Sequence, residues 1–241
     1  MTLAIISDVH GNLTALDAVI RDCESRRISN VVHGGDLVLI GARPAEVLDR
    51  VRELGWPGVV GNTDELLWRP DELERQVRIA PRLAPLLRLL FEEYAPATRK
   101  LLGEERVSWL RELPAELRRG DALVLHAAPG NLWRAPMPDA DDGELIETYG
   151  ALEARLVIYG HIHRPYVRRL DEDMVVANSG SVGLPWDGDP RASYLVAGED
   201  GVEVVRVAYD VEREVAAVLR SGYPDGERIM AMLRRGRFQP P

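Results

Sequence analysis

The N-terminal quarter of the chain alternates short apolar runs with segments of helical periodicity. Strands are predicted at residues 3–6, at residues 30–33 and up to residues 59–60, and helices at residues 13–23 and 44–54. Asn12 is placed to cap the first helix, and Pro44 stands at the first position of the second. This order is typical of parallel strands joined by crossover helices, so the sequence predicts an α/β fold.

Residues 64–112 interrupt the alternation, because four prolines divide this stretch into Leu- and Arg-rich pieces that favour helices. We therefore expect a helical insertion there. Strands are then predicted at residues 122–125, 156–159, 166–170, 174–177, 193–197 and 202–208, and helices at residues 211–220 and 226–235. The short spacing of the later strands suggests antiparallel hairpins, and hence a mixed sheet or two packed sheets.

A chain of 241 residues with 46% apolar and 29% charged residues has the composition of a globular protein. We expect one domain over residues 1–236, insertion included, and a frayed tail over residues 237–241. The N-terminus lacks the features of a signal peptide, no apolar run is long enough to span a bilayer, and the single cysteine, Cys23, cannot form an internal disulfide. These features predict a cytoplasmic protein without membrane association.

The predicted strands end in residues that bind metals. Asp8 and His10 follow the first strand, and because alternate residues of an extended segment face the same way, they can reach one ion together. Asp36 follows two glycines after the second strand, and Asn62 and Asp64 are the second and fourth residues of the Gly-Asn-Thr-Asp segment that follows the third. Their oxygens are hard donors for a divalent cation. Each motif alone is more often a turn.

Histidines complete the pattern. His126 directly follows the strand at residues 122–125, and His161 and His163 follow the strand at residues 156–159. Two imidazoles on one side of an extended turn commonly bind a transition metal. Four of the five histidines stand at strand ends beside the carboxylates, and coincidence explains this poorly. Strand-terminal loops are also where α/β proteins place their sites.

This ordered set, Asp-x-His, Gly-Asp, Gly-Asn-x-Asp, His and Gly-His-x-His, resembles the calcineurin-like metallophosphoesterase superfamily. The resemblance spans Asp8 to His163. The stretch from Asn178, with the sequence Asn-Ser-Gly-Ser-Val-Gly, and the later stretch up to Tyr194 resemble its small bacterial and archaeal phosphodiesterase-like branch. The resemblance implies an αββα sandwich of two mixed β-sheets flanked by helices, in agreement with the hairpins expected in the second half.

The resemblance also implies a dinuclear metal centre and its ligands. One ion is bound by Asp8, His10, Asp36 and His163, and the other by Asp36, Asn62, His126 and His161. The family uses Mn, Fe or Zn, of which we favour manganese. The implied reaction is hydrolysis of a small phosphate ester, with phosphodiesterase activity expected, by attack of a metal-bridging hydroxide. We take Asp36, Asn62 and Asp64 as catalytic candidates.

One position departs from the family pattern. Thr63 stands where many members have the histidine proposed to protonate the leaving group, which leaves Asp64 or a metal-bound water as the proton source. The motifs do not separate a phosphodiesterase from a phosphomonoesterase such as a protein phosphatase or a dinucleoside polyphosphate hydrolase. A noncatalytic metal-stabilised scaffold is the alternative from another class, although a full ligand set argues against it.

The net charge of −9 and the pI of about 5.2 argue against nonspecific binding of nucleic acids. The sequence leaves open whether the chain forms a homo-oligomer. We expect a structural role for His33 and a core position for Cys23, and we treat Arg43, Arg164 and Arg191 as surface residues by default.

Overall fold

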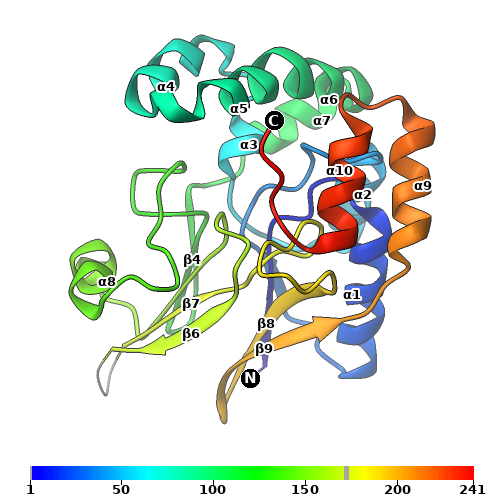
Figure 1. The fold of residues 1–241 in the computed structure, drawn as a ribbon. Coiled ribbons are helices and arrows are strands. Elements are labelled where there is room, and N and C mark those ends of the chain that lie inside the picture. The colour runs from blue at the N-terminus through cyan, green and yellow to red at the C-terminus, as the bar shows by residue number, and fades with distance from the viewer. Residues whose placement is uncertain (1, 171–173) are drawn as a thin grey trace.

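Two mixed β-sheets pack face to face, and helices cover both outer faces (Figure 1). The computed structural model describes residues 2–170 and 174–241. The first sheet has the order β2 (Val31–His33), β1 (Leu3–Ile6), β8 (Ala192–Gly198) and β9 (Gly201–Val207). The second has the order β3 (Glu116–Arg119), β4 (Ala122–Leu125), β5 (Leu156–Tyr159), β7 (Val175–Asn178) and β6 (Tyr166–Arg169). The αββα sandwich expected from the sequence is confirmed.

The central strands are apolar on both faces because one face of each sheet packs on the other sheet and the opposite face packs under helices. Along β1, Leu3 and Ile5 belong to the cluster between the sheets, whereas Ala4 and Ile6 belong to the cluster under the helices. β1 pairs in parallel with β2, β4 with β5, and β5 with β7, whereas the β6–β7 and β8–β9 pairs are the antiparallel hairpins expected from the sequence. The parallel pairs bring several strand ends to one edge of the sandwich.

The first sheet is covered by α1 (Leu13–Ser25), α2 (Pro44–Glu53), α9 (Val211–Ser221) and α10 (Gly226–Arg235), and α8 (Asp142–Tyr149) covers the second (Figure 1). The side chain of Asn12 accepts the Ala15 N–H at 2.9 Å and caps α1 as the sequence predicts. In the part of the chain that the structure describes, no helix is long and apolar enough to cross a membrane.

The helical insertion lies across the edge where the strands end (Figure 1). It contains α3 (Asn62–Glu65), α4 (Leu73–Ile79), α5 (Ala84–Arg88), α6 (Ala95–Leu102) and α7 (Glu104–Arg111). Short 3-10 turns at Pro70–Glu72 and Pro81–Leu83 and a π-helical turn at Leu89–Tyr94 connect these helices. Its helical content agrees with the expectation from its prolines. Because Asn62 is the first residue of α3, the insertion begins at a candidate metal ligand.

Three local features differ from the expectation. The predicted third strand is reduced to a parallel bridge between His33 and Gly58. Val59 N–H donates to His33 O, but the next amide on that side, Gly61 N–H, donates to the Asp64 carboxylate instead of to β2. The sequence did not indicate β3, whose residues are mostly exposed and polar, or α8. The tail at residues 237–241 was expected to fray, but Phe238 packs on Trp186 and Gln239 O accepts a hydrogen bond from the Arg228 guanidinium.

Candidate metal centre

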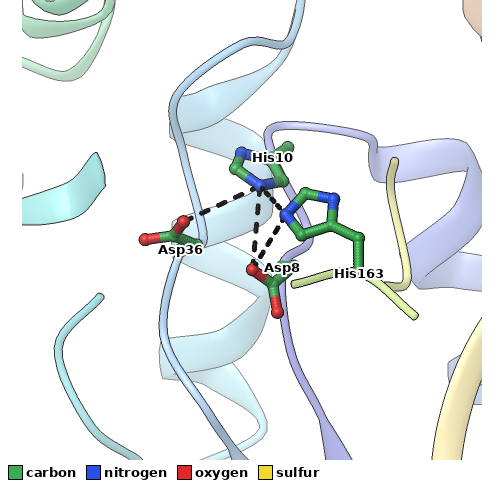
Figure 2. Close-up of side chains that lie close together, drawn as sticks. All are labelled: Asp8, His10, Asp36 and His163. Carbon is green, nitrogen blue, oxygen red and sulfur yellow. Dashed lines mark hydrogen bonds and ion pairs between the residues drawn. The ribbon is translucent and has the colours of Figure 1, made fainter. Parts of the chain in front are cut away.

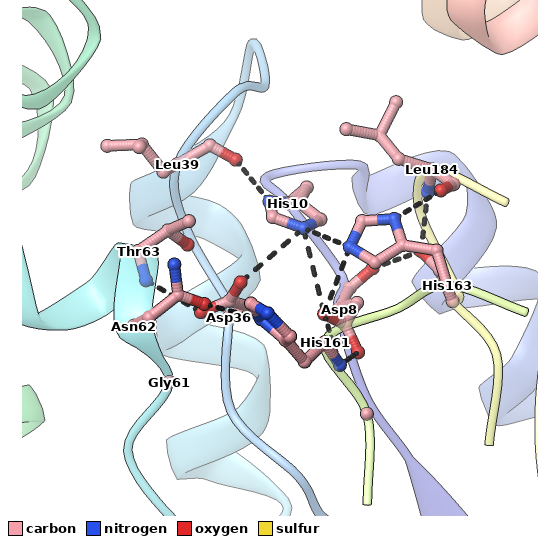
Figure 3. Close-up of polar contacts among 12 residues, drawn as sticks. Asp8, His10, Asp36, Leu39, Gly61, Asn62, Thr63, His161, His163 and Leu184 are labelled. Atoms are coloured by element: carbon pink, nitrogen blue, oxygen red, sulfur yellow. Dashed lines mark hydrogen bonds and ion pairs between the residues drawn. The ribbon is translucent and has the colours of Figure 1, made fainter. Parts of the chain in front are cut away.

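The candidate ligands lie together where β1, β2, β4 and β5 end (Figure 3). Asp8 and His10 follow β1, Asp36 follows β2, Asn62 begins α3, His126 follows β4, and His161 and His163 follow β5. Segments more than a hundred residues apart in the sequence thus meet at one point, as the strand-end motifs predict.

The first group of ligands consists of Asp8, His10, Asp36 and His163 (Figure 2). All four are buried, and one donor atom from each lies within 4.8 Å of the others. His163 Nε2 lies 3.1 Å from Asp8 Oδ1, and His10 Nε2 lies 3.8 Å from Asp36 Oδ2. Two imidazole nitrogens and two carboxylates around one point form a donor set suited to a transition-metal ion.

The second group is formed by Asn62, His126 and His161 on the other side of Asp36. Asn62 Oδ1 lies 2.8 Å from His126 Nε2 and 3.0 Å from His161 Nδ1. Asp36 Oδ1 lies 3.5 Å from His126 Nε2. The two oxygens of Asp36 therefore face different groups, which is the geometry that a bridging carboxylate requires.

Backbone carbonyls orient three of the imidazoles. The Nδ1 atoms of His10 and His126 each lie 2.8 Å from a carbonyl oxygen, of Leu39 and Gly34 respectively. His163 Nδ1 lies 2.5 Å from Leu184 O. An Nδ1–H that donates to a carbonyl leaves the lone pair on Nε2, the nitrogen that faces the other ligands.

Burial and neighbouring charges act on the pKa values of four candidate ligands. At His126, burial lowers the pKa, but the nearby carboxylates of Asp36 and Asp8 outweigh it and raise the pKa of that imidazole. Burial lowers the pKa of His10 and of His161 to about 4, so both imidazoles are neutral near neutral pH. Burial acts to raise the pKa of Asp8, but His163 and its neighbours outweigh it and hold that pKa well below the usual range. Neutral imidazoles beside an ionised carboxylate are ready to bind a cation.

Five of the seven candidate ligands have left-handed backbone. Their φ angles are 55° at Asp8, 49° at His10, 54° at Asp36, 64° at His161 and 55° at His163. Residues other than glycine rarely adopt this conformation, which costs about 1–3 kcal/mol at each position. Such strain clusters where a fold aims side chains at a common point, and here it occurs at the strand ends that carry the motifs.

Glycines in the motifs allow the loops to approach the ligands closely. A β-carbon on Gly61 would overlap Asp36 Oδ1, and one on Gly160 would overlap Asp8 Oδ2. The glycines that precede Asn62 and His161 are therefore required by packing against the two carboxylates.

The late motif that starts at Asn178 supports the same loops. The Asn178 side-chain amide donates to Gly160 O at 2.5 Å, and the Ser181 hydroxyl donates to Asp8 O at 2.7 Å. These residues hold the turns that carry Asp8 and His161, and they belong to the positioning of the site. In the sequence, this motif indicated a family resemblance but not its role in holding these turns.

Asp64 does not have the position of a catalytic acid. Its carboxylate is fully buried and accepts the backbone N–H groups of Asp36 at 2.8 Å, Leu37 at 3.0 Å and Gly61 at 3.2 Å. It does not line the cavity beside the ligands. Burial and the charge of Asp36 raise its pKa to about 7, against these amides, which lower it. We therefore propose that Asp64, a catalytic candidate from the sequence, acts as a positioning residue that joins the loops carrying Asp36 and Asn62.

We predict that Asp64→Asn destabilises the fold by about 2–4 kcal/mol, because the amide NH₂ would face backbone donors in a buried place. Chemical denaturation at pH 8, where the wild-type carboxyl is ionised, measures this effect. Asp17→Asn is the matched control, since Asp17 forms a partly exposed ion pair with Arg50 and its loss should cost about 1 kcal/mol or less. Equal effects of the two changes would contradict the positioning role.

The other residues weighed from the sequence have distinct environments. His33 is fully buried with neither ring nitrogen paired, and it packs near Trp109, away from the ligands. Cys23 lies in the core, as expected. Arg43 is not a free surface residue, because it forms an ion pair with the buried carboxylate of Glu214.

Two further residues do lie at the site. Trp186 stacks on the ring of His163, with ring centroids 3.7 Å apart. Arg164 lines the adjoining cavity and is exposed. No local pattern in the sequence distinguished either from a surface or turn residue.

The geometry agrees with comparisons to known proteins. A family model described as the calcineurin-like phosphoesterase superfamily domain matches residues 1–201. The chain belongs to this superfamily. Uncharacterized protein MJ0912 of Methanocaldococcus jannaschii is 31% identical over 255 residues, which cover 94% of this chain and 96% of that protein.

Two solved structures share the fold of this calcineurin-like phosphoesterase. A metallophosphoesterase from Sphaerobacter thermophilus has a TM-score of 0.78 and 28% identity, covering 98% of this chain and 99% of its own. Hypothetical protein PH1004 from Pyrococcus horikoshii OT3 has a TM-score of 0.79 and 19% identity, covering 99% of both chains. The resemblance seen in the motifs is thus confirmed, and the buried Asp and His group is one that can bind metal.

Proposed function

We propose that this chain is a dinuclear metal-dependent phosphodiesterase. The observation that carries the proposal is the position of Asp36, whose two oxygens face separate groups of nitrogen and oxygen donors. A protein that used one structural ion would need only one of these groups.

The donors present fit divalent ions. Both groups combine imidazole nitrogens with carboxylate or amide oxygens, a mixture that suits Mn, Fe or Zn, and we take Mn as the ion for testing. Two such ions would polarise phosphoryl oxygens and make a water acidic enough to act as a nucleophile near neutral pH. The chain itself orients the ligands through Leu39, Gly34 and Leu184, and it holds Asp36 through the Thr63 N–H at 2.9 Å.

The charges around the site favour a diester. Besides the histidines of the candidate metal centre, the basic residues among the described lining of the adjoining cavity are Arg164 and Arg228. Arg228 already bonds Asp225 and the Tyr94 hydroxyl, which leaves Arg164 as the free guanidinium among the described lining residues. The two proposed ions would serve the reacting phosphoryl group of a diester, a monoester or a polyphosphate alike. Outside them, a single guanidinium leaves the second charge of a monoester dianion or the further charges of a polyphosphate with less to match them than the one charge of a diester.

The test is to load the protein with Mn and to compare bis(p-nitrophenyl) phosphate with p-nitrophenyl phosphate and a dinucleoside polyphosphate. We expect two ions per chain by elemental analysis, and a kcat/KM for the diester that is about tenfold or more above that of the monoester, equivalent to about 1.4 kcal/mol. Preference for the monoester would favour a phosphomonoesterase. Turnover of none of the three by the loaded protein would favour the scaffold.

A further inference from the structure

A cavity of about 370 Å³ adjoins the candidate metal centre. At one end it is lined by His10, Asp36, Asn62, Thr63, His161 and His163. The rest of its lining is mostly apolar and includes Leu83, Leu86, Trp133, Met137, Trp186 and Phe238. Its volume is within the range of small-molecule sites, about 300–1,000 Å³.

The apolar wall comes from segments that lie outside the two sheets. Leu83 and Leu86 belong to the helical insertion, Trp133 and Met137 to the loop before α8, and Phe238 to the C-terminal tail. Figure 1 shows the tail running back from the end of α10 toward the insertion. The cavity thus lies between the insertion and the tail, the two parts of the chain that extend beyond the sandwich at this edge.

Aromatic rings give this wall a defined shape. Trp133 stacks on Phe91, with centroids 6.0 Å apart and planes inclined by 10°. Trp186 lies between the His163 ring and the edge of Phe238, whose centroid is 5.1 Å away. The apolar surface therefore begins at Trp186, which is in direct contact with the candidate metal ligand His163.

Two of the apolar side chains that line the cavity are exposed to solvent. Leu83 is 50% exposed and Met137 is 41% exposed. Arg164 also lies at the cavity, and no hydrogen bond or ion pair of this side chain is found within the described residues. One free guanidinium beside an apolar wall matches a molecule with a single phosphoryl group and an apolar substituent.

We propose that the cavity selects phosphodiesters in which one ester group is a bulky apolar chain or ring. This inference rests on the proposed phosphodiesterase function and names its substrate class. The phosphoryl group would lie at the ligand end near Arg164, and the apolar ester group would lie between the insertion and the tail. Leu83 and Met137 are then specificity-determining residues, and a polyphosphate is a poor substrate because its further charges would meet an apolar wall.

The experiment uses p-nitrophenyl alkyl phosphates with methyl, butyl and octyl groups, and a phenyl analogue, on the Mn-loaded chain of 241 residues. We expect kcat/KM to rise roughly two- to fourfold per methylene group until the cavity is filled. A rise for the alkyl series alone would identify an aliphatic ester group, and a larger effect of phenyl than of butyl would identify an aromatic one. Calorimetry with methyl and octyl esters of methylphosphonic acid measures the same preference as a Kd without turnover.

Leu83→Gln should reduce the octyl-to-methyl ratio by about five- to tenfold, since a polar group would replace part of the wall. Leu219→Gln is the matched control, because Leu219 is also 50% exposed and does not line the cavity. The phosphonates carry no nitrophenyl ring that could fill the cavity, so an equal Kd for the methyl and octyl phosphonates, with normal turnover of the methyl nitrophenyl ester, would overturn this inference and leave the phosphodiesterase proposal standing. Chain-length-dependent phosphonate binding without any turnover would support the cavity and overturn the proposed hydrolysis.

Discussion

Asp36→Asn is expected to remove both metal ions and to abolish hydrolysis. An asparagine keeps the shape of the side chain but offers one neutral oxygen, and its NH₂ group would face either the His10 side or the His126 side. Loss of a residue that only orients a ligand costs about 10–100-fold in metal affinity, so loss of a bridging carboxylate should cost more than about 100-fold at each site. Activity in saturating Mn should fall by at least about 10³, which corresponds to about 4 kcal/mol.

Metal titration followed by elemental analysis shows whether a substitution removes both ions or only one. His10→Ala removes a donor that belongs to the first group alone. It should therefore weaken the binding of one ion and leave the other ion bound. Asp49→Asn, at a surface ion pair with Arg106, is the control for loss of a carboxylate and should bind both ions. If Asp36→Asn retained one ion at wild-type affinity, Asp36 would not be a bridge.

The proximity of the candidate ligands could be predicted from the sequence, because their placement follows from local rules. Each of Asp8, Asp36, His126 and His161 stands just beyond a short apolar strand, and parallel strands of one sheet end at the same edge. The helix after Asn12 and the prolines of the insertion are likewise local signals. The two-sheet arrangement came from the resemblance together with the spacing of the late strands.

Other features depend on long-range contacts that the sequence does not display. The carboxylate of Asp64 accepts hydrogen bonds from amides of two separate loops. Because these contacts are not visible in the sequence, the motif alone did not distinguish Asp64 from a catalytic acid. The cavity wall is assembled from segments around Leu83, Trp133, Trp186 and Phe238, which share no period or motif. Polar β3 was missed because exposed edge strands lack the apolar alternation that marks a strand.

Thr63→His is expected to change which substrates the enzyme prefers. Thr63 lines the cavity beside Asp36 and Asn62, and its hydroxyl has no hydrogen-bond partner among the described residues. An aliphatic hydroxyl is too weak an acid to protonate a leaving group near neutral pH, whereas an imidazolium is not. Asp64 is held by backbone amides, and among the described residues that line the cavity the one carboxyl group is that of the candidate ligand Asp36.

The wild type should therefore favour esters whose leaving group needs no proton, such as nitrophenolate, over alkyl esters that release an alkoxide. A positioned general acid is typically worth about 10²–10⁴ in rate, so Thr63→His should raise the alkyl-to-nitrophenyl ratio of kcat/KM by about 10². The gain should decline as the pH rises above about 6.5, where imidazolium loses its proton. Thr63→Gln, of similar size but without a titratable proton, is the control at equal metal content. An unchanged ratio in Thr63→His, or an equal rise in Thr63→Gln, would mean that protonation of the leaving group does not limit the reaction.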